Sequence, residues 1–163
     1  MSQTFTEDKA VQEVAEVYAN DAISFAKDVF KIKLDWSDES IESIERILDV
    51  MHQDAQRNSP TEDQIMGFAK ALGSYVGEVF RRNHGATWGI VRLGDEAFPG
   101  LQAGKMKGVF WPWGKARNRI VNGEEDNIVH YYKVLVREGS DKPFGGSPAN
   151  GGKKSFWARL RGA

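Results

Sequence analysis

Cysteine is absent from this chain of 163 residues, and histidine occurs only three times. Without cysteine there can be no disulfide framework, no thiolate zinc site and no cysteine nucleophile. The histidines, His52, His84 and His130, stand apart and lack the H-x-x-x-H spacing of a zinc site. We therefore expect no metal and no cofactor, and the lack of cysteine suits a cytoplasmic protein.

Long apolar runs and catalytic signatures are missing as well. No segment approaches the ~18 apolar residues of a membrane span, and the N-terminal stretch lacks the regions of a signal peptide. The sequence contains no nucleophile elbow, no phosphate loop and no dinucleotide fingerprint. These absences favour a non-catalytic protein.

Charge is present in both signs but is unevenly distributed. Residues 1–64 hold 15 acidic and 6 basic side chains, whereas residues 65–163 hold 8 acidic and 16 basic ones. Such a chain either presents separate acidic and basic surfaces to partners or neutralises the two halves against each other within the fold.

The best-specified helix follows Ser59. Ser59 before Pro60, with Glu62 three residues after the serine, predicts a capping box with proline at the first helical position. Basic residues and then Gly85 predict the end of this helix. Apolar side chains recur between these ends at helical spacing: Ile65, Phe68, Ala69, Leu72, Val76, Val79 and Phe80.

Gly73 and Gly77 lie four residues apart within this central helix. Glycine costs about 1 kcal/mol relative to alanine in a helix, so two on one side call for a reason. They indicate either close packing against another element or a groove that admits a ligand or a partner's side chain.

Two further helices are expected before the central one. The first spans residues 6–30, and the second runs to about Gln56 after an N-cap at Ser37, with Trp36 and Ile41 as a hydrophobic staple. The outer face of the second helix is acidic and is either solvated or a docking surface for a basic partner. The first helix is expected to bury one stripe: Val11, Val14, Ala15, Tyr18, Ala22, Phe25, Ala26 and Val29.

After the central helix the apolar pattern changes to that of strands. Residues 87–93, 107–111 and 117–121 are predicted strands, and residues 98–100 (Phe-Pro-Gly) are predicted to form a turn. An Asn-Gly turn at residues 122–123 then precedes a closing helix, whose first turn is expected to hold Glu124, Glu125 and Asp126.

The segment 105–119 has the most unusual composition of the chain because bases alternate with aromatics. Such a segment could bind a protein partner through tryptophan and arginine hot spots, or single-stranded nucleic acid or an anionic ligand through phosphate contacts and stacking. A structural role, with tryptophans in the core and bases on the surface, is the third reading. Its candidate binding residues are Trp111, Trp113, Lys115, Arg117 and Arg119.

Glu78 and Arg82 form an i,i+4 pair near the end of the central helix and, with Trp88, complete the candidate binding residues. An enzyme would need a dispersed site built from Glu78, Arg82, Arg117, Arg119 and Glu124, whose convergence a sequence does not reveal.

At these positions the sequence resembles a family of small bacterial domains of unknown function. The resemblance covers about residues 60–138 and is carried by an LG-x-Y-x-GE helix (residues 72–78), a G-x-x-W strand (residues 85–88) and an R-x-x-NGEED turn (residues 119–126). It implies an α+β domain and no particular activity. Domains of this type also occur as immunity or accessory partners of bacterial toxins, which is an association only.

The composition changes again at Gly139. Residues 139–152 are rich in Gly, Ser and Pro and predict a flexible linker, and residues 153–163 form a basic amphipathic tail without acidic residues. The tail is either unstructured or an anchor for a partner, for the acidic N-terminal half of this chain or, weakly, for a membrane surface. Its candidate anchor residues are Phe156, Trp157, Arg159 and Leu160.

Together these patterns predict an α+β fold in one domain, residues 1–138, with an acidic helical front (residues 1–58) and a family-like core (residues 59–138). Two N-terminal helices, a central helix, a small antiparallel sheet and a closing helix make up the predicted architecture. The expected function is protein binding, as an immunity or adaptor protein, with nucleic-acid or anionic-ligand binding as the alternative. The sequence does not define an oligomeric state.

Overall fold

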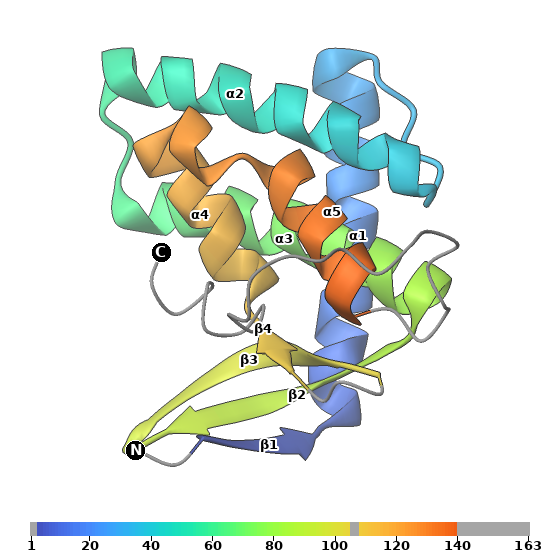
Figure 1. Ribbon diagram of the computed structural model, residues 1–163. Helices are drawn as coiled ribbons and strands as arrows, with labels where there is room; N and C mark the ends of the chain where they lie inside the picture. Colours follow the sequence, from blue (N-terminus) through green and yellow to red (C-terminus); the bar gives the residue numbers. More distant parts are fainter. Residues whose placement is uncertain (1–2, 105–107, 140–163) are drawn as a thin grey trace, which may run out of the picture.

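The computed structural model describes residues 3–104 and 108–139, and it confirms the α+β class. The predicted linker and tail, including Phe156, Trp157, Arg159 and Leu160, lie outside the described residues, apart from Gly139. In Figure 1 the helices lie above a four-stranded sheet, and α1 rises from the sheet behind them. The elements are β1 (Gln3–Glu7), α1 (Lys9–Phe30), a 3-10 turn η1 (Asp38–Ser40), α2 (Ile41–Asn58), α3 (Glu62–His84), β2 (Ala86–Leu93), β3 (Glu96–Ala103), β4 (Val109–Phe110), α4 (Pro112–Asn122), a 3-10 turn η2 (Glu124–Asp126) and α5 (Ile128–Gly139).

The sheet is antiparallel throughout, in the order β1-β2-β3-β4. The N-terminal strand β1, which the sequence did not predict, pairs Gln3 with Leu93 and Glu7 with Gly89, so the first helix starts at Lys9 and not at residue 6. The predicted turn at residues 98–100 is also wrong, because Pro99 pairs with Ile90 inside β3. Since β4 pairs only with residues 101 and 102, β3 is an edge strand at Pro99, where proline is tolerated.

Helix α3 begins at a capping box, but not the predicted one. The Thr61 side chain accepts a hydrogen bond from the Gln64 N–H, and the Gln64 side chain accepts one from the Thr61 N–H. Ser59 instead ends α2 in the left-handed conformation, with φ of 44°. The predicted end of α3 is confirmed, since Gly85 caps it with φ of 88°. Ser37 also acts as an N-cap, although the turn that it caps is η1.

Two elements after the sheet differ from the prediction. The predicted strand 117–121 is the second half of helix α4, which has proline at its first position. The three acids at residues 124–126 form the separate turn η2, and α5 begins only at Ile128. These acids are therefore not the first turn of α5. Glu124 and Asp126 form ion pairs with basic residues of α4.

The glycines of α3 permit close packing. A Cβ atom on Gly73 would lie 2.5 Å from the Pro112 carbonyl oxygen at the start of α4, and one on Gly77 would lie 2.6 Å from the Trp88 ring. Both contacts are shorter than van der Waals distance, so only glycine fits without a shift. This observation supports the packing explanation for the pair and not a groove.

Candidate functional site

Glu78 and Trp88, two of the candidate binding residues, lie in the core and stabilise the fold. The Glu78 carboxylate is fully buried and accepts hydrogen bonds from Trp88 Nε1 at 2.9 Å and Arg81 Nε at 2.6 Å. Burial alone would raise the pKa of Glu78, but these hydrogen bonds and the charges of Arg81 and Arg82 outweigh it, so its pKa lies below the usual value. Arg82 also covers the Trp36 ring, with 3.7 Å from its guanidinium carbon to the ring centre.

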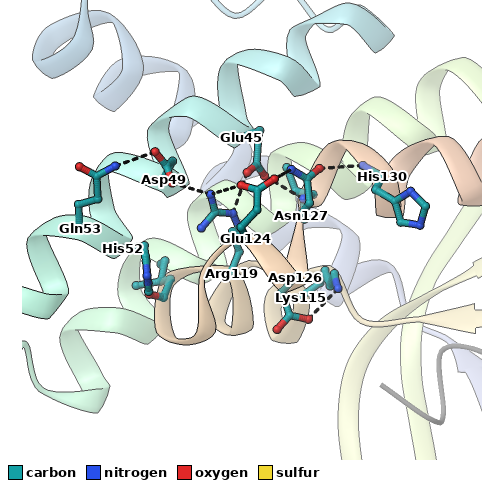
Figure 2. A network of polar contacts seen from close by, with 12 residues as sticks. Glu45, Asp49, His52, Gln53, Lys115, Arg119, Glu124, Asp126, Asn127 and His130 are labelled. Atoms are coloured by element: carbon teal, nitrogen blue, oxygen red, sulfur yellow. Dashed lines mark hydrogen bonds and ion pairs between the residues drawn. The ribbon is translucent and has the colours of Figure 1, made fainter.

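Arg119 in α4 links the neighbouring turn η2 to α2, which is distant in the sequence. Figure 2 shows its guanidinium between α2 and η2, with Nε 2.7 Å from Glu45 and Nη2 2.8 Å from Asp49 and 3.4 Å from Glu124. The side chain has no exposed surface. Glu45 also accepts the Ile128 N–H at 2.8 Å, so the same carboxylate fixes the start of α5. This network explains the position of Glu124.

The other two candidate bases of segment 105–119, Lys115 and Arg117, are paired as well. Lys115 forms a 2.8 Å ion pair with Asp126, and Arg117 forms one of 2.5 Å with Glu62 at the start of α3. Three bases that could have contacted phosphates are therefore neutralised within the chain. The nucleic-acid or anionic-ligand alternative, which needs free bases in this segment, stays a prediction.

The tryptophans of this segment are half-buried. Trp113 donates a 2.6 Å hydrogen bond to Ser74 and packs edge-on against Tyr18, with 5.8 Å between the ring centres. The Trp111 Nε1 atom is buried and has no hydrogen-bond partner among the described residues. The structure therefore distributes the predicted binding residues over separate contacts.

The dispersed Glu/Arg site does not assemble either. Glu78 and Arg82 belong to one network, Arg119 and Glu124 to a second, and Arg117 to a third with Glu62. Within the described residues no group of three or more His, Asp and Glu is arranged to hold a metal ion.

One hollow does combine polar groups with an opening. It has a volume of about 560 Å³ and lies between the start of α2 and α5, with Asp38 and Tyr132 in its lining. Asp38 accepts hydrogen bonds from Tyr132 and from His84, the latter at 2.9 Å. Burial raises the pKa of Asp38, but hydrogen bonds from Tyr132, His84 and Asn83 outweigh it, so the pKa is lowered. Burial also raises the pKa of Tyr132. An ionised acceptor and a protonated tyrosine stabilise each other here.

Helix α1 presents an unusual distribution of apolar residues. Its small residues Ala15, Ala19, Ala22 and Ala26 are all fully buried, so α1 packs closely against α3. Some of its larger apolar residues stay outside, with Val14 exposed by 45% and Val29 by 61%. The predicted single buried stripe is therefore wrong for these valines. A helix that buries alanine and exposes valine leaves apolar surface available for a partner.

A groove continues this exposed face. Two adjoining hollows of about 470 and 300 Å³ share Phe25, Gln64 and Phe68. We call them together the α1–α3 groove, which also takes in the second half of α2. Val50 and Phe68 line it and are exposed by 51% and 40%. The residues that line it include Tyr18, Asp21, Phe25, Val29, Val50, Asp54, Asp63, Gln64 and Phe68.

Charge in the α1–α3 groove has one sign. Asp21, Asp54 and Asp63 line it, and no Lys, Arg or His appears among the residues that line its two hollows. An apolar floor with an acidic rim fits a ligand that has apolar side chains and positive charge.

The sequence interpretation missed this groove because it assigned Phe68 and Val29 to the core. One signal could have revealed it: Ala15, Ala19, Ala22 and Ala26 follow the 4-3-4 spacing of a close helix contact. That spacing defines the buried side of α1 and leaves the valines outside.

Comparisons with known proteins extend only to the fold. No protein-family model and no curated protein matches the chain. A crystal structure from Bacteroides thetaiotaomicron VPI-5482 is similar, with a TM-score of 0.62 and 17% identity over 83% of this chain and 48% of that chain. This chain thus spans about half the length of that one. Among the described helices, none is long and apolar enough to cross a membrane.

Proposed function

We propose that this chain is a non-catalytic protein-binding domain, which receives a basic amphipathic helix of a partner protein in the α1–α3 groove. The observation that carries the proposal is the face of α1, which buries four alanines and leaves Val14 and Val29 exposed. Exposed apolar surface that continues into a groove marks sites of protein association.

The acidic rim determines which partner the groove favours. Asp21 and Asp63 border the groove near Phe68, and Asp54 borders it near Val50. A helix with apolar residues at i, i+3 and i+4 and with Lys or Arg on its flanks would satisfy both features. An immunity or adaptor role in a bacterial cytoplasm, as the sequence resemblance and the lack of cysteine suggest, is the concrete form of this proposal.

A selection of displayed peptides on the immobilised full-length protein tests the proposal. We expect enrichment of basic amphipathic helices. Replacing Phe68→Asp should weaken their binding at least tenfold, because a hot-spot aromatic in such a groove contributes about 2 kcal/mol or more.

The matched control for this experiment is Phe98→Asp in β3. Phe98 is exposed by 36% and Phe68 by 40%, so both substitutions place a carboxylate on an exposed aromatic position. Peptide binding should survive Phe98→Asp. Equal binding to both variants, with thermal unfolding showing that both are folded, would contradict the proposal.

A further inference from the structure

We infer that the α1–α3 groove is the docking site of this chain's own segment 153–163, so that a partner must displace this segment in order to bind. The inference rests on the proposed function of the groove and specifies how access to it is regulated. Residues 140–163 lie outside the described residues, and the lining of the groove, the sequence of the segment and the length of the intervening chain support the inference.

The chemistry of the segment complements that of the groove. Phe156, Trp157 and Leu160 have the i, i+1, i+4 spacing that places three apolar side chains on one helical face. Lys153, Lys154, Arg159 and Arg161 surround them, and the segment contains no acidic side chain. The groove offers exposed apolar side chains, three aspartates in its lining and no base there.

The other large hollow fits this segment less well. It lies beside α5, close to the point where the described chain ends, and is therefore easier to reach. However, His130, Lys133 and Arg137 line it beside its acids. These bases offset the acids of that lining, whereas no base offsets the three aspartates that line the α1–α3 groove, so the groove attracts a segment with four positive charges more strongly.

The intervening chain is long enough to reach the groove. Sixteen residues separate Gly139 from Phe156. Extended, they span up to about 55 Å, whereas a folded chain of this size has a radius of gyration of about 15 Å and is about 40 Å across. A path over the surface to the point opposite Gly139 would need about 60 Å, so a linker of this length reaches most of the surface but not that far pole.

Tethering makes even a weak contact sufficient. A ligand on a linker of this length meets its site at an effective concentration on the order of millimolar. A segment that binds with a dissociation constant of about 100 μM as a free peptide would then occupy the groove about nine-tenths of the time. Competition would weaken an external ligand by about tenfold.

The absence of cysteine permits a direct test on the full-length chain. Ser155→Cys creates the only cysteine, which can carry a nitroxide spin label. We expect paramagnetic broadening of the NMR signals of Val29, Val50 and Phe68, and none at Arg92 in β2. Broadening that is absent from the groove, or equally strong at Arg92, would overturn the inference.

Two controls complete the spin-label experiment. Phe68→Asp should abolish the broadening at Val29 and Val50, whereas Phe98→Asp should leave it unchanged. Mixing isotope-labelled protein without a nitroxide and unlabelled protein with one separates the sources of the effect. Broadening that persists in this mixture would assign the contact to a second copy and overturn self-docking.

A peptide titration separates this inference from the proposed function. The probe is a fluorescent synthetic peptide of residues 153–163, added to the full-length chain and to the full-length triple variant Phe156→Ser, Trp157→Ser, Leu160→Ser. Binding about tenfold tighter to the triple variant supports self-docking. Equal binding to both proteins overturns self-docking and leaves the proposed function intact. Absence of binding to both proteins also overturns self-docking, and the peptide selection then decides the proposed function independently.

Discussion

From the close contact between α3 and α4 at Gly73 we predict that Gly73→Ala lowers the free energy of unfolding. Gly73→Ala would place a Cβ atom 2.5 Å from the Pro112 carbonyl oxygen and 2.9 Å from the Trp113 Cα atom. Both are backbone atoms, so no side-chain rotation can relieve the contact and α4 itself must move. Gly67 lies in the same helix, and a Cβ atom there would meet nothing within 4 Å.

The two substitutions share the same intrinsic gain. Replacing glycine by alanine within a helix favours folding by about 1 kcal/mol. At Gly67 this gain should appear in full and raise the melting temperature by about 2–4 °C. At Gly73, overpacking costs typically about 1–3 kcal/mol. Since the contact is with backbone, we expect the upper end and a net loss of about 2 kcal/mol, a fall of about 4–8 °C.

Thermal unfolding followed by circular dichroism, together with urea titration, measures both variants. The expected result is opposite signs, with a difference of about 3 kcal/mol between them. If Gly73→Ala stabilises the protein as much as Gly67→Ala does, then α3 and α4 do not approach as closely as described, and the packing explanation for this glycine is wrong.

Two further substitutions probe the buried polar networks. Arg119→Met should reduce the free energy of unfolding by about 3 kcal/mol near neutral pH, the lower end for a broken buried pair, because Asp49 is partly solvated. The hydrogen bond from Arg119 lowers the pKa of Asp49, so this ion pair stabilises the fold above the ordinary aspartate pKa and loses that effect as the pH falls below it. The difference in unfolding free energy between the variant and the unmodified protein should therefore shrink in acid. A difference that stays constant with pH would refute this reasoning. Tyr132→Phe removes a donor to Asp38 and should raise the pKa of that carboxyl, as NMR titration would show; an unchanged pKa would mean that Tyr132 does not stabilise the carboxylate.

Helices with strong local signals were predictable from the sequence. The span of α2 and the Gly85 end of α3 follow from caps and apolar periodicity, both of which act within a few residues. Helix α4 was mistaken for a strand because it is only 11 residues long and its buried side depends on α2 and α3. Strand β1 was missed for the same reason, since its partner β2 lies more than 80 residues away.

The candidate site was the least predictable part. Sequence reasoning valued residues by type, so Trp88 and Arg119 appeared to be binding residues, yet both are buried and serve the fold. It also assigned Val29 and Phe68 to the core, where their apolar character would place them. Only the arrangement of α1 against α3 shows that alanines fill that contact and that the larger residues remain outside.

The sequence by itself determined the α+β class, the end of α3 at Gly85 and the absence of motifs for metal or nucleophilic chemistry, because each depends on residue type or on neighbours close in the chain. The tertiary structure alone decided which charges are neutralised, which aromatics are buried and where an apolar groove opens. These properties arise from pairs such as Arg119 with Glu45 and Arg117 with Glu62, which lie 74 and 55 residues apart and meet only when the helices pack.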